Sequence, residues 1–198
     1  SSAHAILFFA ALPSLERAQF MPSFAITAAY HSVGRFVAIG NGVQKICQDE
    51  FDVHIPFNKA YFLRCIATPE GQRAFDMVFP RIIKLLNGIN LSERTWVNDL
   101  FEGRRFVASV DKDSILAFND YSASDMAIFF GLEDKVDFPI IKTNPLPYMD
   151  EFANISMSQK SPQEEDNNQY KLNVVKFDDE DKVFSLKPKE KGSFNFVL

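Results

Sequence analysis

Alternation of apolar and polar positions is the strongest pattern in the first part of the chain. Apolar side chains recur at every second position in two segments, namely Phe24, Ile26, Ala28 and Tyr30, and then Phe51, Val53, Ile55 and Phe57. A two-residue period places alternate side chains on one face of a β-strand. Between these segments, Gly40-Asn41-Gly42 favours a hairpin turn, because Asn and Gly tolerate positive φ angles. The pattern therefore predicts antiparallel strands in this part of the chain.

The period becomes helical in the centre of the chain. Thr68-Pro69-Glu70 is typical of a helix start, with a capping side chain, a proline in the first turn and an early acid. The apolar positions that follow fit a 3.6-residue period: Phe75, Val78, Phe79, Ile82, Ile83 and Leu86. We expect this helix to stop at Asn87-Gly88 and a second helix to begin at Ser92. The sequence thus predicts a central helical block.

Strand-like runs return toward the C-terminus. Short apolar segments occur at 105–110, 115–119, 125–130 and 136–142. The stretch 159–169 has no large apolar side chain, and we expect it to form a mobile loop. The tail contains three further strand-like segments and therefore predicts a three-strand meander.

These elements together predict the fold class and the domain organisation. Runs of strands around a helical block are typical of an α+β fold with mainly antiparallel sheets. We expect an α+β core at 1–158, a mobile acidic loop at 159–169, and a C-terminal β-meander at 170–198 packed on the core.

Composition adds an excess of phenylalanine. Among 198 residues there are 21 Phe, against five Tyr and one Trp, and 46% of the chain is hydrophobic. Each aromatic ring can bury on the order of 150–250 Å², so the chain can form a substantial core. The net charge of -5 argues against a broad basic surface for nucleic acid or for membrane lipids. No apolar run approaches the roughly 20 residues that a membrane span needs.

The cysteines and the N-terminus bear on the compartment. The two cysteines, Cys47 and Cys65, are too few for a disulfide scaffold and are expected to be reduced core residues. The chain begins at Ser1, which indicates a processed or trimmed N-terminus. We therefore expect an intracellular, soluble protein.

One group of ionisable residues suggests an enzyme. Asp125 precedes an apolar run, and Glu133-Asp134-Lys135 follows it. This spacing resembles the pattern of Mg²⁺-dependent nucleases of the PD-(D/E)xK type, although no proline precedes Asp125. The resemblance implies that Asp125 and Glu133 hold the metal ion on adjacent strands, with Lys135 near the attacking water.

The leading hypothesis is instead a non-catalytic subunit of a larger protein assembly. No catalytic signature is specific, and surplus apolar rings near a surface mark partner interfaces. The candidate interaction residues are Phe8, Phe9, Phe129, Phe130, Phe194, Phe196 and Leu198. A C-terminal strand at a sheet edge could also pair with another chain.

The remaining expectations follow from this hypothesis. We expect protein partners or self-association, no cofactor, no metal ion and no direct nucleic-acid contact. A further alternative starts from the similarity between segments 51–57 and 136–141, which would fit two related half-modules. Such a chain could be an acidic clamp-like protein around DNA, provided that its inner face is basic.

Overall fold

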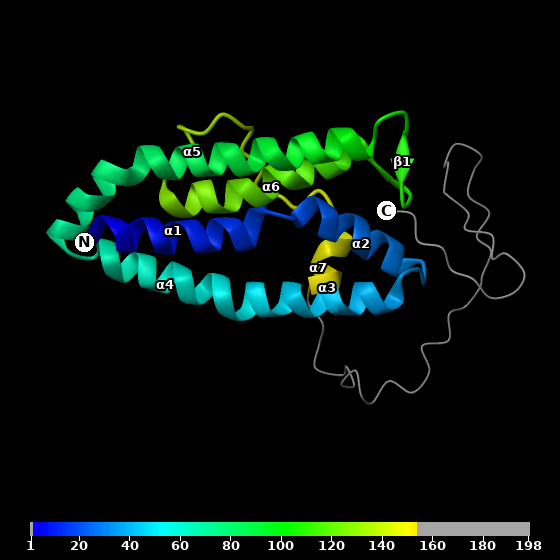
Figure 1. Ribbon diagram of the computed structural model, residues 1–198, viewed down its shortest axis with the longest axis horizontal. Helices are drawn as coiled ribbons and strands as arrows, with labels where there is room; N and C mark the ends of the chain where they lie inside the picture. Colours follow the sequence, from blue (N-terminus) through cyan, green and yellow to red (C-terminus); the bar gives the residue numbers. More distant parts are fainter. Residues whose placement is uncertain (1, 154–198) are drawn as a thin grey trace, which may run out of the picture.

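A computed structural model describes residues 2–153, which form a bundle of helices (Figure 1). The helices are α1 Ser2–Ala18, α2 Met21–Ser32, α3 Val37–Asp49, the π-helical turn η1 Glu50–His54, α4 Ile55–Ile66, α5 Pro69–Leu100, α6 Lys112–Phe130 and α7 Pro147–Ala153. A short antiparallel hairpin of β1 Phe106–Val107 and β2 Val110–Asp111 joins α5 to α6.

The predicted α+β class is therefore wrong. Within residues 2–153 the fold is mostly helical, and its sheet consists of β1 and β2. The predicted loop at 159–169 and the predicted meander at 170–198 lie outside the described residues.

The alternating segments belong to helices for a simple geometric reason. A strand period of two also generates i,i+4 neighbours, and these share one face of a helix. Phe51 and Ile55, for example, are four residues apart and lie in η1 and α4. Segments as short as these fit both periods, so packing against the rest of the chain decides between them.

Gly40 and Gly42 lie within a helix instead of a turn. Both are in α3, and Gly40 is buried directly against the side chain of His31 on α2. A Cβ atom at position 40 would overlap the His31 ring, whereas a Cβ at position 42 would meet nothing. The glycine at position 40 thus permits close packing of α2 on α3.

The predicted start of the central helix is confirmed. The Gly71 backbone N–H donates a hydrogen bond to Thr68 Oγ1 at 3.1 Å, and Pro69 occupies the first turn of α5.

The predicted stop at Asn87-Gly88 is wrong, because α5 continues to Leu100. A helical glycine costs only about 1 kcal/mol relative to alanine. Leu86 and Ile89, on either side of Gly88, are buried in the core and keep this part of α5 helical.

The strands predicted within 115–130 are also wrong, because these residues form α6. Asp111 caps this helix, since its Oδ1 accepts a hydrogen bond from the Ser114 backbone N–H at 2.9 Å. Gly131 ends α6 with a φ of 67°.

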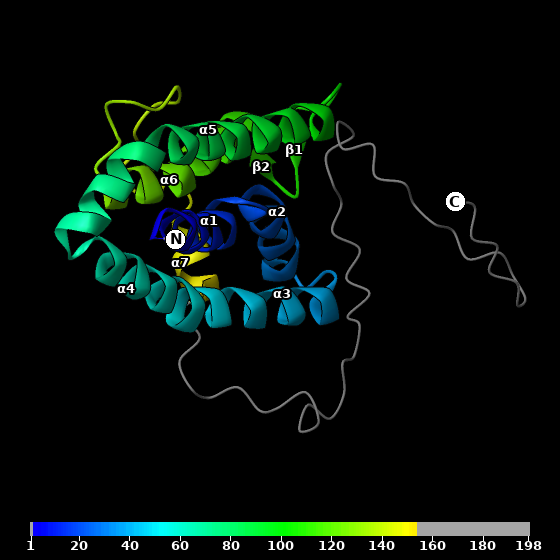
Figure 2. The ribbon, with the colours of Figure 1, turned by 60° about the vertical axis from the view of Figure 1, so that its left-hand side comes forward.

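Helix α1 is the centre of the bundle. It lies between α4 on one side and the paired helices α5 and α6 on the other, as both ribbon views show (Figures 1 and 2). The first core forms around α1 and includes Ile6, Ala10, Phe62, Ile82, Leu86 and Met126. The second core forms around α2, α6 and α7 and includes Met21, Val97, Ile115, Phe118 and Met149.

Helices α3 and α4 continue one another through η1 (Figure 1). The residues at both junctions keep right-handed helical dihedral angles, so the backbone is helical from Val37 to Ile66. We call this segment, 37–66, the α3–α4 rod.

Candidate functional site

The π-helical turn η1 in the α3–α4 rod lies beside several charged side chains. A π-turn inserts an extra residue into a helix and occurs frequently at functional sites. Its residues face the C-terminal end of α1, where Glu16 and Arg17 lie. Two neighbouring features result, a carboxylate–imidazole cluster and a cavity.

The carboxylate–imidazole cluster consists of Glu16, Glu50 and His54. One ligand atom from each residue lies within 4.8 Å of the others. His54 Nδ1 lies 3.1 Å from Glu50 Oε2, and Asn58 Nδ2 donates to Glu16 Oε2 at 3.2 Å. Two carboxylates and an imidazole are donors that a divalent ion such as Zn²⁺ accepts, so this cluster could hold a cation.

The electrostatics of this cluster favour a positive partner. Burial raises the pKa of Glu16 above its ordinary value, and the nearby Glu50 carboxylate raises it further. The Glu50 carboxylate therefore makes ionisation of Glu16 less favourable, and an approaching cation would relieve this repulsion.

Arg17 of α1 contacts two aromatic rings, one of them from the π-turn. Its guanidinium carbon is 5.3 Å from the centroid of Phe51 and 5.2 Å from that of Tyr121. Its Nε lies 3.3 Å from Asp125 Oδ2. The Arg17 Nη1 atom is buried and has no hydrogen-bond partner among the described residues.

Asp125 is the meeting point of two cations. Its Oδ2 accepts from Lys59 Nζ at 3.2 Å and pairs with Arg17. The Lys59 ammonium also lies 4.9 Å from the ring centroid of Phe129. These contacts join α1, α4 and α6 at the level of the π-turn.

A cavity of about 200 Å³ lies next to Arg17. Its polar lining consists of Arg17, Asp52, Asn144 and Asp150, and its apolar lining includes Phe51, Phe118, Tyr121 and Met149.

Helix α7 forms one wall of this cavity and is fixed in place at both of its faces. Asn144 Nδ2 donates to Asp150 Oδ1 at 2.8 Å, and the Leu146 N–H donates to Asn144 Oδ1 at 2.9 Å. The Tyr148 hydroxyl donates to the Ala25 carbonyl oxygen on α2 at 3.0 Å.

Exposed apolar side chains follow one side of the α3–α4 rod. These side chains and two polar residues between them form one row of the helix, because successive positions are three, four or seven residues apart. The row consists of Ile39, Ile46, Glu50, His54, Phe57 and Tyr61. Phe8 and Phe9 of α1 extend this row, since Phe9 stacks on Tyr61 at 5.2 Å and Phe8 contacts Phe9 edge-on at 5.2 Å. We call the six apolar residues of this row, Phe8, Phe9, Ile39, Ile46, Phe57 and Tyr61, the apolar flank.

The apolar flank is unusually exposed for its composition. Phe8 is 56% exposed, Phe57 55% and Ile39 60%. The carboxylate–imidazole cluster interrupts the row between Ile46 and Phe57. The surface thus has apolar ends and an acidic centre.

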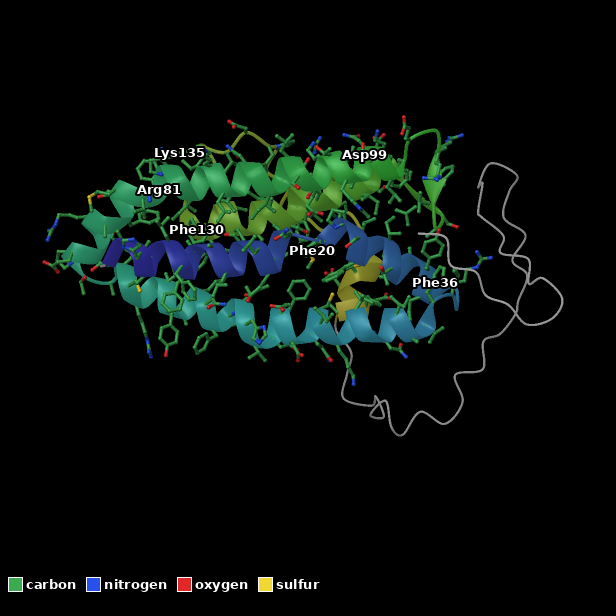
Figure 3. The ribbon with its side chains drawn as sticks, viewed as in Figure 1. Phe20, Phe36, Arg81, Asp99, Phe130 and Lys135 are labelled. Atoms are coloured by element: carbon green, nitrogen blue, oxygen red, sulfur yellow. The ribbon has the colours of Figure 1, made fainter. Side chains whose placement is uncertain are left out.

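The other predicted interaction residues lie elsewhere. Phe130 is buried and Phe129 is half-buried, and both rings pack against Phe62 of α4. Figure 3 shows Phe130 at the end of α6, inside the bundle. Phe194, Phe196 and Leu198 lie outside the described residues.

The residues of the nuclease hypothesis do not lie on adjacent strands. Asp125 is within α6, and Glu133 and Lys135 follow the end of that helix. The Lys135 ammonium lies 5.9 Å from the ring centroid of Phe79 on α5. Asp125 is engaged by Arg17 and Lys59, as described above.

Several residues of the site were missed by the sequence patterns. Glu50 and His54 have the i,i+4 spacing of a chelating helical pair, a signal that is visible only if the segment is taken as a helix. Glu16 lies far from them in sequence, and only the packing of α1 on the rod brings it close.

In comparisons with known protein families and with curated protein sequences, the chain matches none. None of the helices within residues 2–153 combines the length and the apolar composition that crossing a membrane requires.

Proposed function

We propose that this chain is a non-catalytic interaction subunit that binds an amphipathic helix of a partner protein along the apolar flank. The observation that carries the proposal is the row of exposed rings and aliphatic side chains at Phe8, Phe57, Tyr61 and Ile39. Exposed apolar surface of this kind marks sites of protein association. A row of apolar side chains along a helix is the natural counterpart of a second helix that presents its own apolar face.

The acidic centre of the flank specifies the partner further. Glu16 and Glu50 lie between the two apolar ends, and Glu50 Oε2 lies 3.1 Å from His54 Nδ1. A Lys or Arg in the middle of the partner's apolar seam would pair with these carboxylates. The partner is therefore a helix with apolar residues at both ends of its contact face and one basic residue at its centre.

Charge disfavours a second copy of this chain as the partner. A two-fold arrangement centred on the flank places the residues at its centre near their own copies. Glu16 and Glu50 of both copies would then meet without a lysine or arginine from this row. Like charges at an interface cost free energy, so a basic partner of different sequence fits better.

A synthetic helix tests this proposal on the full chain. The probe is a fluorescein-labelled peptide of about 20 residues, long enough to form a helix, with a leucine seam and one central lysine. A second peptide has glutamate in place of that lysine. We expect saturable binding of the lysine peptide by fluorescence anisotropy and binding of the glutamate peptide weaker by about tenfold or more.

A matched pair of variants locates the binding surface. Phe57→Ser removes an exposed ring of the flank, and Leu91→Ser removes a comparably exposed side chain, 66% exposed, on α5. We expect Phe57→Ser to weaken binding of the lysine peptide by about tenfold or more, as for an aromatic interface residue, and Leu91→Ser to leave it unchanged. Equal effects of the two substitutions, or equal binding of the two peptides, would contradict the proposal.

The nuclease alternative stays a prediction. The strand arrangement that it required is absent from residues 2–153. The clamp-like alternative also stays a prediction. So does pairing through a C-terminal edge strand, because the residues of that strand lie outside the described part of the chain.

A further inference from the structure

The cavity beside Arg17 contains a buried cation with an unused donor. Arg17 is nine-tenths buried and lines the cavity, and its Nη1 has no hydrogen-bond partner among residues 2–153. Buried charged groups in proteins nearly always have hydrogen-bond partners, and an unmade bond to a charged donor is costly. The Arg17 side chain lines the cavity, so its charge favours an anionic group there.

The surroundings of Arg17 restrict how such a molecule can bind it. The rings of Phe51 and Tyr121 both lie against the guanidinium, and Asp125 occupies the Nε position. Only the in-plane N–H groups that remain can donate to a ligand. This geometry suits a planar anion such as a carboxylate, which accepts in the plane of the guanidinium.

The same cavity also contains two carboxylates. Asp52 comes from the π-turn η1 and Asp150 from α7, where Asn144 holds one of the Asp150 oxygens. A ligand that carries only negative charge would be repelled by Asp52 and Asp150. A ligand that also carries an ammonium group would pair with them.

We propose that this cavity binds a free amino acid with an aliphatic side chain. Its carboxylate would accept from Arg17, its ammonium group would donate to Asp52 or Asp150, and its side chain would contact Phe118 and Met149. The cavity of about 200 Å³ is large enough to admit an amino acid. The proposal is independent of the apolar flank, since the flank residues do not line this cavity.

Three small molecules of similar shape separate the two charges. L-Leucine carries both, 4-methylpentanoate carries only the carboxylate, and isopentylamine carries only the ammonium group. Isothermal titration calorimetry of the full chain with each compound measures the affinities. We expect saturable binding of L-leucine at millimolar or lower concentration and binding of each single-charge compound weaker by about tenfold or more.

A charge-removing variant then assigns the ammonium site. Asp52→Asn removes a cavity carboxylate, and Asp49→Asn removes an exposed carboxylate at the end of α3 that does not line the cavity. In Asp52→Asn we expect L-leucine to bind more weakly and 4-methylpentanoate to bind more tightly, because repulsion of the anion is reduced. In Asp49→Asn we expect both affinities to stay as in the parent chain. A general loss of structure would not change the two affinities in opposite directions.

Three results would overturn the proposal. The first is an absence of saturable L-leucine binding. The second is L-leucine binding no tighter than that of the two single-charge compounds. The third is a double variant with Asp52→Asn and Asp150→Asn that binds L-leucine and 4-methylpentanoate as the Asp49→Asn variant does.

Discussion

Arg94 Nη1 donates to both carboxylate oxygens of Asp120, at 2.7 and 2.8 Å, and this ion pair joins α5 to α6 behind the site. The Asp120 side chain is 5% exposed, whereas that of Arg94 is 35% exposed. Asn90 donates to the same carboxylate at 2.8 Å. When the pair is broken, water can solvate the partly exposed Arg94 but not the buried Asp120. An unpaired Asp120 therefore costs more free energy than an unpaired Arg94.

This asymmetry gives the first prediction. Arg94→Met leaves the Asp120 carboxylate buried with the hydrogen bond from Asn90 but without its cation, and we expect a loss of about 3 kcal/mol in the free energy of unfolding. Asp120→Asn leaves a partly exposed arginine that water can solvate, and we expect a smaller loss of about 1–2 kcal/mol. Urea unfolding followed by circular dichroism measures both values. A larger loss in Asp120→Asn than in Arg94→Met would contradict the asymmetry.

Two glycines of one helix give a pair of opposite predictions. Gly40→Ala forces a Cβ atom into the His31 side chain, and we expect a loss of about 1–3 kcal/mol in the free energy of unfolding. Gly42→Ala meets no atom within 4 Å, so it should stabilise α3 by about 0.5–1 kcal/mol through helix propensity. Thermal and urea unfolding of the two variants give the sign directly. The prediction fails if both substitutions shift stability in the same direction.

The start of the central helix at Thr68 was predicted correctly, whereas the fold class was not. The Thr68 side chain accepts a hydrogen bond from the helix that it precedes, and this interaction depends on neighbouring residues only. The alternation at 51–57 failed because a short run fits a strand and a helix equally well. The outcome there depends on Phe51 and Ile55 packing toward α1, which is a long-range property of the chain.

The residues of the candidate site could likewise be predicted from the sequence only in part. The exposure of Phe8 agrees with its selection as a surface ring, although its role in binding stays a prediction. The abundance of phenylalanine also indicated a ring-rich core, and Phe62 contacts three other Phe rings there. By contrast, Arg17 and Glu16 gain their partners only through tertiary contacts with η1, α4 and α6, which no spacing rule encodes.

The two cysteines should differ in reactivity. Burial raises the pKa of Cys47 to about 12, so its reactive thiolate is nearly absent at neutral pH. Cys65 is only half-buried. With iodoacetamide under native conditions, we expect mass spectrometry to find Cys65 modified well before Cys47. In urea, both cysteines should react at similar rates, and early modification of Cys47 in the folded chain would show that α3 opens readily.

The last prediction concerns Glu16 and connects stability with binding. The pKa of Glu16 is raised in the folded chain by burial and then by Glu50, so folding favours its protonated form. This contribution to stability is fully present below the pKa of Glu16 in the unfolded chain. It is lost as the pH rises through the folded pKa. Glu16→Gln should therefore be more stable than the parent chain at pH 7 and lose this advantage in acid, while its amide oxygen still accepts from Asn58.

The same substitution should weaken binding if the acidic centre of the flank pairs with a basic partner. We expect Glu16→Gln to bind the lysine peptide more weakly at pH 7 even though it resists urea better. Asp76→Asn, at an exposed position on α5, serves as the control and should change neither property. If Glu16→Gln gains stability and keeps full peptide affinity, then burial of the Glu16 carboxylate destabilises the fold and Glu16 does not contribute to the interface.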